Sequence, residues 1–263
     1  MSEQPQIRFE DGAAYESFMG IWSRSVGQQF LDWVKPEPGL DWIDVGCGNG
    51  AFTELLVERC KPARVLGFDP SPAQLTYARE RHKAGVATFV EGDAMAISAE
   101  DKSFDAAVMA LVIFFVPQPA KGVAEMVRVV RPGGVISAYA WDILGGGFPL
   151  HVIQEEMESM GLPPLLPPSA EASRMDNLRG LWTEAGLTGV ETREIIVERT
   201  FGNFEELWSI SQSGPRLSQL LKGLTPEARE VLREKVRLRL PAGGSGAITT
   251  GARAHAVKGR VPA

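Results

Sequence analysis

The segment spanning residues 42–52 constrains the fold more than any other part of the chain. It reads as an apolar strand that ends in an acid, followed by a turn containing Gly46, Gly48 and Gly50 and by the start of a helix. Glycine has no Cβ, so such a turn bends sharply and lets a ligand lie against its backbone. Amides at the start of the following helix can face that ligand. We therefore expect a ligand site at this turn.

The spacing of the glycines separates two kinds of nucleotide site. Dinucleotide-binding proteins use G-x-G-x-x-G and hold a pyrophosphate. This chain has G-x-G-x-G, with Asp44 two residues before the first glycine. A carboxylate at that position repels a pyrophosphate and attracts a cation. S-adenosylmethionine, which carries an ammonium group and no phosphate, fits the turn better, and NAD is the alternative.

Further motifs follow in order along the chain and resemble those of the class I S-adenosylmethionine-dependent methyltransferases, in particular the small-molecule, type 11/25-like domains. The motifs are D-x-G-x-G-x-G at 44–50, GFDPS at 67–71, EGDA at 91–94, a strand within 104–115, and RVVRPGGV at 128–135. One of these motifs alone is weak evidence. All of them, in order and at the expected spacings over residues 40–142, make the resemblance specific.

The resemblance assigns roles to the acids at the strand ends. Asp44 lies near the methionine ammonium, Asp69 accepts from both ribose hydroxyls, and Asp93 accepts from the adenine amino group. Open α/β sheets bind ligands at the carboxyl ends of their strands, so these acids are expected to converge on one crevice.

The N-terminal segment resembles the lid helix of small-molecule methyltransferases. In that resemblance Arg24 pairs with the methionine carboxylate, and Tyr15 or Trp22 closes over the cofactor; the alternative is an aromatic stripe facing the core beside a solvated arginine. The full set of expected cofactor-binding residues is Tyr15, Trp22, Arg24, Asp44, Gly46, Cys47, Gly48, Asp69, Pro70, Asp93, Ala94, Met95 and Leu111.

Strands alternate with helices between about residues 41 and 142, which predicts a parallel sheet covered by helices on both faces. Helix starts are indicated by Ser71 before a proline, by Asn203 three residues before Glu206, and by Thr225 before a proline. The resemblance implies an α/β, Rossmann-like, doubly wound sheet of seven strands, parallel with one antiparallel edge strand, plus helical cap insertions. The expected parts are N-terminal lid helices at 1–40, a cofactor-binding core at 41–142, a cap segment at 143–175, and the rest of the core at 176–263, with a helical insertion at about 203–240.

Methyl transfer from S-adenosylmethionine is a direct in-line displacement, so the protein mainly holds the acceptor in line and excludes water. A catalytic dyad is therefore not required, although an acceptor hydroxyl would gain from a general base. His151 follows the fifth strand and a glycine hinge and is the candidate base; the alternative is a histidine without a catalytic role. With 3 histidines and 2 cysteines dispersed along the chain, we expect no metal site.

Composition narrows the function further. The net charge is −6 and basic residues form no stripe, which argues against a nucleic-acid partner. No apolar run reaches the roughly 20 residues needed to cross a bilayer, and the first ten residues do not read as a signal peptide. We expect a cytoplasmic enzyme, monomeric or homodimeric, that methylates a small and partly apolar molecule. The alternatives are an NAD-dependent oxidoreductase and a non-catalytic S-adenosylmethionine-binding module.

Overall fold

The computed structural model describes residues 19–82, 85–164, 166–240, 243–244 and 246–263. One seven-stranded sheet has the order β3-β2-β1-β4-β5-β7-β6. All neighbouring strands are parallel except at β7, which is antiparallel to both β5 and β6. The strands are β1 (Asp41–Val45), β2 (Arg64–Asp69), β3 (Ala87–Glu91), β4 (Phe104–Ala110), β5 (Val130–Trp141), β6 (Thr188–Phe201) and β7 (Ile248–Arg260).

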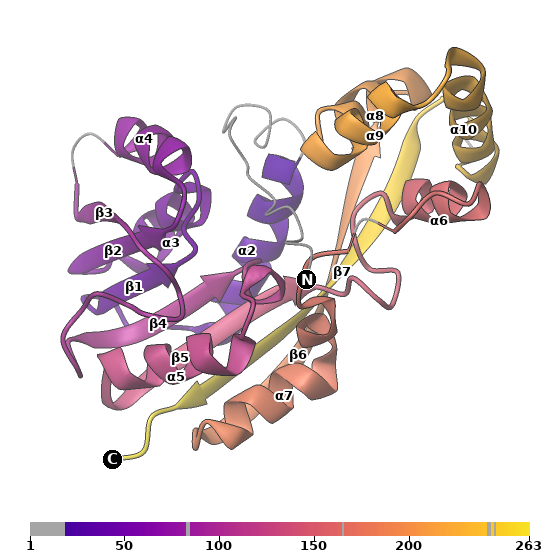
Figure 1. Cartoon of the computed structure of the whole chain (residues 1–263). Helices are drawn as coiled ribbons and strands as arrows, with labels where there is room; N and C mark the ends of the chain where they lie inside the picture. Colours follow the sequence, from indigo (N-terminus) through magenta and orange to yellow (C-terminus); the bar gives the residue numbers. More distant parts are fainter. Residues whose placement is uncertain (1–18, 83–84, 165, 241–242, 245) are drawn as a thin grey trace.

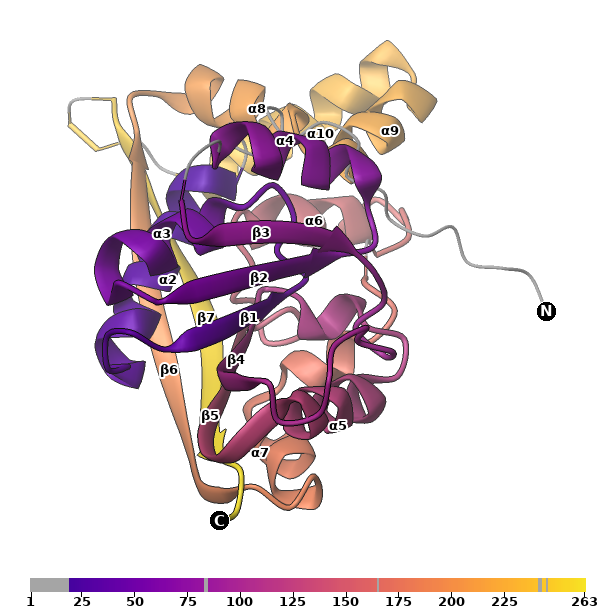
Figure 2. The same ribbon diagram turned by 90° about the vertical axis from the view of Figure 1, so that its left-hand side faces the viewer.

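Helices cover both faces of the sheet, as the doubly wound prediction requires (Figures 1 and 2). Strand side chains alternate between faces, so residues 136 and 139 of β5 mark opposite faces. The Tyr139 ring packs on Phe30 of α2 with ring centroids 4.6 Å apart. On the other face, the indole N–H of Trp182 in α7 donates to the carbonyl oxygen of Ile136 at 3.0 Å. The first face carries α2 (Ile21–Val34), α3 (Ala51–Cys60) and α4 (Pro72–Arg81); the second carries α5 (Pro119–Val129) and α7 (Met175–Glu184).

The hairpin of β6 and β7 runs beyond the rest of the sheet (Figure 1). β5 pairs with β7 up to Trp141 opposite Ala254, whereas β6 and β7 continue to pair as far as Phe201 opposite Ile248. Because β6 is parallel to β1–β5, this ribbon leaves the sheet on the side where those strands end. It leads into α8 (Phe204–Gln212), α9 (Pro215–Gly223) and α10 (Pro226–Arg239).

The helices α8–α10 and a further helix, α6 (His151–Ser159), together are called the cap below. Helix α6 follows β5 and lies against α10. Arg239 of α10 binds Glu155 at 2.7 Å and Glu156 at 2.8 Å. Lys235 of α10 lies 3.6 Å from Glu156. Ion pairs thus join α6 to α10, although the two helices are some eighty residues apart in the chain.

The predicted helix starts are confirmed. Ser71, Asn203 and Thr225 each accept a hydrogen bond from the amide three residues later, at 3.4, 2.9 and 3.2 Å. Each cap satisfies a helix amide that has no partner within its own helix. The antiparallel strand of the predicted edge hairpin is β7, which lies one strand inside the edge, and the outermost strand is β6.

Candidate functional site

The glycine turn after β1 needs two of its glycines for different reasons. Gly46 has φ +79°, and a Cβ there would lie 2.5 Å from the methyl groups of Val112, the residue that follows the end of β4 by two. Gly48 has φ +53°, and nothing lies within 4 Å of the position that its Cβ would take. Gly46 therefore allows close packing of two strand ends, whereas Gly48 provides a left-handed turn beside open space.

Asp44 is fully buried at the end of β1. Its Oδ2 accepts a hydrogen bond from the Thr53 hydroxyl of α3 at 2.6 Å, while its Oδ1 is buried with no hydrogen-bond partner. Burial raises the pKa of Asp44 to about 7; the Thr53 bond opposes this shift and nearby Asp69 adds to it. A buried acceptor without a donor is uncommon in folded proteins, and a cationic donor would satisfy it.

Asp69, at the end of β2, fastens the glycine turn to the neighbouring strand. Its Oδ2 accepts from the amide of Gly48 and its Oδ1 from the amide of Ser71, both at 2.9 Å. Burial raises the pKa of Asp69, and the two amide bonds oppose that shift. Each carboxylate oxygen has a second lone pair, so Asp69 can accept two further donors without releasing the turn.

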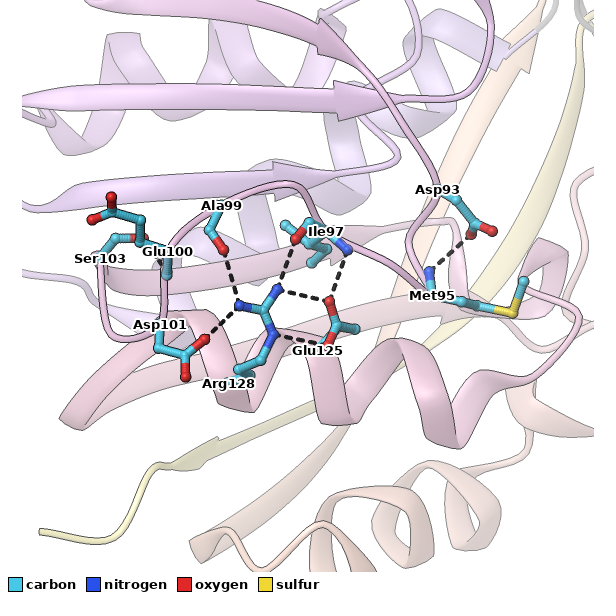
Figure 3. Close-up of polar contacts among 9 residues, drawn as sticks. All are labelled: Asp93, Met95, Ile97, Ala99, Glu100, Asp101, Ser103, Glu125 and Arg128. Atoms are coloured by element: carbon cyan, nitrogen blue, oxygen red, sulfur yellow. Dashed lines mark hydrogen bonds and ion pairs between the residues drawn. The ribbon is translucent and has the colours of Figure 1, made fainter.

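Asp93 lies in the loop after β3, next to Asp69 along the sheet. The Gly92 amide donates to the carbonyl oxygen of Asp69 at 3.1 Å, which joins the two strand ends. The Asp93 side chain is exposed, and its Oδ1 accepts from the Met95 amide at 2.8 Å (Figure 3). Ala94 and Met95 are half-buried. Three strand-end acids, Asp44, Asp69 and Asp93, thus lie along one edge of the sheet, as the sequence indicates.

Three more of the residues expected to bind the cofactor are Cys47, Pro70 and Leu111. Cys47 is buried in a small cluster with Leu75, Ala78 and Phe89 beneath α4, and burial raises the pKa of its thiol, so it is a packing residue. Pro70 is exposed at the start of the turn after β2. Leu111 has φ +62° and donates its amide to the carbonyl oxygen of Tyr139 at 2.8 Å, so the backbone turns sharply at the end of β4.

Of the three residues that the resemblance places in an N-terminal lid, the structure describes Trp22 and Arg24. Tyr15 lies outside the described residues. Trp22 is buried in the core with its indole N–H unpaired, but so is Trp42 at the far end of β1, so this alone does not indicate a ligand. Arg24 is half-exposed and pairs with Glu58 of α3 at 2.8 Å. Glu58 lies two turns along α3 from the glycine turn, so the structure does not bring Arg24 to the strand-end acids.

His151 is the first residue of α6. Its Nε2 lies 3.3 Å from Glu155 Oε1 one turn later, and its Nδ1 is buried without a hydrogen-bond partner. The described contacts place it in the cap rather than against the glycine turn. Asp142, the residue after β5, accepts from the guanidinium of Arg253 at 2.6 and 3.0 Å and so has a structural partner.

Two residues of this site escaped the sequence prediction. Thr53 holds one oxygen of Asp44, and Val112 occupies the space beside Gly46. Thr53 lies in the first turn of the helix that follows the glycine turn, which is the one signal that could have identified it. Val112 makes its contact across the sheet, and nothing near it in the sequence indicates that contact.

Within the part of the chain that the structure describes, no group of three or more His, Cys, Asp or Glu side chains is placed to hold a metal ion. None of the helices among these residues has the length and apolar character needed to cross a membrane.

A family model described as a methyltransferase domain matches residues 43–138, which contain the glycine turn and all three strand-end acids. This part of the chain is a methyltransferase domain. The predicted family is therefore confirmed, and S-adenosylmethionine, the predicted cofactor, is the one that this family uses.

Known relatives of this methyltransferase domain differ in what they act on. A fatty-acid O-methyltransferase of Mycolicibacterium smegmatis is 29% identical over 71% of this chain and 65% of its own length. A malonyl-[acyl-carrier protein] O-methyltransferase of Serratia marcescens is 35% identical over 43% of each chain. Phosphoethanolamine N-methyltransferase 2 of Haemonchus contortus, solved with phosphomonomethylethanolamine and S-adenosylhomocysteine, superposes with TM-score 0.61 at 17% identity, covering 97% of this chain and 59% of that one. The matches to curated relatives span between 27% and 65% of those proteins.

The raised pKa of Asp44 predicts that the stability of the folded protein depends on pH. Replacing Asp44 with a residue that cannot ionise should remove this dependence. Between its ordinary pKa of 3.8 and about 7, the folded protein binds a proton that the unfolded chain has released, so Asp44 makes the free energy of unfolding fall as pH rises. Asp44→Asn keeps an acceptor for Thr53 and cannot ionise. Its stability relative to the wild type should increase by about 2 kcal/mol from pH 5 to pH 8, measured by urea denaturation without ligand.

The matched control for this comparison is Asp93→Asn, which changes an exposed aspartate of the same crevice edge. Its stability relative to the wild type should be the same at both pH values. An Asp44→Asn difference that is equally constant with pH would show that Asp44 titrates as an ordinary carboxyl group.

Proposed function

We propose that this protein is an S-adenosylmethionine-dependent methyltransferase that transfers a methyl group to a small-molecule acceptor by direct in-line displacement. The observation that supports this most is the buried, unpartnered Oδ1 of Asp44 beside the left-handed turn at Gly48. An ammonium group would satisfy this oxygen, whereas a pyrophosphate would be repelled. The residues present therefore fit S-adenosylmethionine better than NAD.

Each part of the crevice edge has a distinct task in this proposal. Asp44 binds the amino group of the methionine portion, and this favours the ionised form of its carboxyl. Asp69 accepts from the ribose hydroxyls with the lone pairs that Gly48 and Ser71 leave free. Asp93 accepts from the adenine amino group, and Ala94 and Met95 pack beside the ring. The bound cofactor would supply an electrophilic methyl group on a sulfonium, so the protein's contribution is to align and to exclude water.

The acceptor site of this proposal lies under the cap formed by α6 and α8–α10. The cap has a substantial apolar interior, and pockets built from such residues suit apolar ligands. One relative is named for a fatty acid, which supports a partly apolar acceptor. The buried apolar residues of α8–α10 are Phe204, Leu207, Trp208, Leu217, Leu221, Leu232 and Val236.

The ribose assignment predicts a large effect of Asp69→Ala. The substitution removes the charged acceptor for two hydroxyls and also releases the Gly48 amide, so the affinity for S-adenosylhomocysteine should fall by about a hundredfold or more. Calorimetric titration of the full chain measures this. Glu80→Gln, an exposed acid of α4 near the same strand, is the control and should leave the affinity unchanged. If Asp69→Ala binds as tightly as the wild type, the ribose site is elsewhere.

His151 is proposed as the base for an acceptor that must lose a proton. Its Nδ1 is buried without a partner, and Glu155 Oε1 lies 3.3 Å from its Nε2, where a carboxylate can orient the ring. With an acceptor found by transfer of a labelled methyl group to a panel of fatty acids and thioesters, His151→Ala should lower kcat by about a hundredfold, with the affinity for S-adenosylhomocysteine unchanged. An unchanged kcat would leave His151 without a catalytic role.

A further inference from the structure

The loop that joins β3 to β4 is fastened to α5 by Arg128 (Figure 3). The guanidinium donates to both carboxylate oxygens of Glu125, from Nε at 2.9 Å and from Nη2 at 2.8 Å. It also donates to the carbonyl oxygens of Ile97 and Ala99, at 2.7 and 2.9 Å, and to the carboxylate of Asp101 at 2.6 Å. These bonds use all five N–H donors of the guanidinium, so Arg128 holds three separate points of one loop.

Glu125 completes this clamp from the same helix. Its Oε2 accepts from the amide of Ile97 at 2.8 Å, so both the N–H and the C=O of Ile97 are held by α5. The Arg128 bond lowers the pKa of Glu125, and the same bond raises the pKa of Arg128, so the pair stays ionised over the working pH range. The Ile97 side chain is itself buried in the core. The backbone is therefore fixed two residues after Met95.

The clamped loop is the one that carries Asp93 to Met95. On its other side, the loop is joined to the sheet by the Gly92 amide on the Asp69 carbonyl oxygen. Between these two attachments, the side-chain and backbone bonds of Asp93 run within the loop itself, to Met95 and Ala96. Ala94 and Met95 pack against the core, so the segment between the two attachments is held by apolar contacts and by the hydrogen bonds at its two ends. The attachment at Ile97 is the polar one on the α5 side, and its loss frees that end of the segment to open locally.

We propose that Arg128 is a positioning residue for adenine recognition: through Ile97 it fixes the loop in which Asp93 meets the adenine amino group. This inference rests on the proposed function, because Asp93 has its adenine role only if the crevice binds S-adenosylmethionine. Arg128 touches no cofactor atom in this account and acts only through the loop. The inference also gives a task to the first arginine of the RVVRPGGV motif, which has no role in the crevice itself.

The second arginine of the same motif provides a matched control. Arg131 binds the carboxylate of Asp105 and the carbonyl oxygen of Ser103, the latter at 2.9 Å, and lies 3.8 Å from Asp41. Asp41 and Asp105 lie at the amino ends of β1 and β4. This is the opposite edge of the sheet from the carboxyl ends, where Asp44, Asp69 and Asp93 lie. Arg131 thus makes contacts of the same kind as Arg128, but it reaches the β3–β4 loop only at Ser103, the last residue before β4, and makes no contact at Ile97.

The test compares S-adenosylhomocysteine with S-inosylhomocysteine, in which a 6-oxo group replaces the adenine amino group. The oxo group cannot donate to Asp93, so the wild type should prefer S-adenosylhomocysteine by about tenfold or more in calorimetric titrations. In Arg128→Gln this preference should fall to about twofold or less, because the loop no longer holds Asp93 in place. Arg131→Gln should keep the wild-type preference even if its stability is lowered.

A second variant and a second measurement keep the test decisive if Arg128→Gln folds poorly. Arg128→Lys retains the charge but has three donors on one nitrogen, which cannot reach all three attachment points, so its preference should also fall. In the protein without ligand, hydrogen exchange at the Ile97 amide should be at least tenfold faster in either Arg128 variant than in Arg131→Gln. An Arg128 variant that keeps the wild-type preference overturns the positioning role.

The outcomes also separate this inference from the proposed function. If the wild type does not bind S-adenosylhomocysteine, both are overturned together. If the wild type binds both nucleosides equally, the adenine role of Asp93 is wrong, and the positioning inference fails while the cofactor assignment stands.

Discussion

The whole site depends on one buried carboxylate. Asp44 is fully enclosed at the end of β1, has one oxygen bound to Thr53, and leaves the other without a donor. Desolvation of this group is unfavourable, and the protein retains it where the backbone turns at Gly46 and Gly48. The neighbouring elements are arranged around that point: α3 supplies Thr53, β2 supplies Asp69 to hold the turn, and the end of β4 packs against the turn. The buried Asp44 carboxylate destabilises the protein without a cationic partner and would bind a ligand that supplies one. Binding sites commonly lower stability in this way.

Local motifs in the sequence predicted the features that depend on local backbone geometry. The parallel strands, the glycine turn, the strand-end acids and the three helix caps all follow from residues close together in the chain. Arg24 was placed by resemblance alone, and its direction is set by how α2 packs, with Trp22 and Phe30 turned into the core. The contacts of Val112 with Gly46 and of Arg128 with the β3–β4 loop join distant segments, so no local pattern reveals them.

The cofactor-binding part and the proposed acceptor-binding part of the site are built in different ways. The cofactor half consists of the loops that follow β1, β2 and β3. Asp69 and Asp93 hold these loops by accepting hydrogen bonds from backbone amides. The proposed acceptor half comprises α6 and the helices that follow the β6 strand of the long β6–β7 ribbon. Arg239 and Lys235 of α10 join these helices to Glu155 and Glu156 of α6. Relatives that match this core are named for chemically different acceptors, and one fold can carry many different sites. In the function proposed above, the cap is the part that selects the acceptor.

The most direct test of the cation site at Asp44 is a pair of calorimetric titrations of the full chain, with S-adenosylhomocysteine and with NAD, each at pH 6 and pH 8. We expect micromolar binding of S-adenosylhomocysteine, tighter at pH 8 because its ammonium group favours the ionised form of Asp44, and no binding of NAD. Binding of NAD without S-adenosylhomocysteine would show that the glycine turn holds a pyrophosphate, and it would contradict both the role of Asp44 and the proposed reaction.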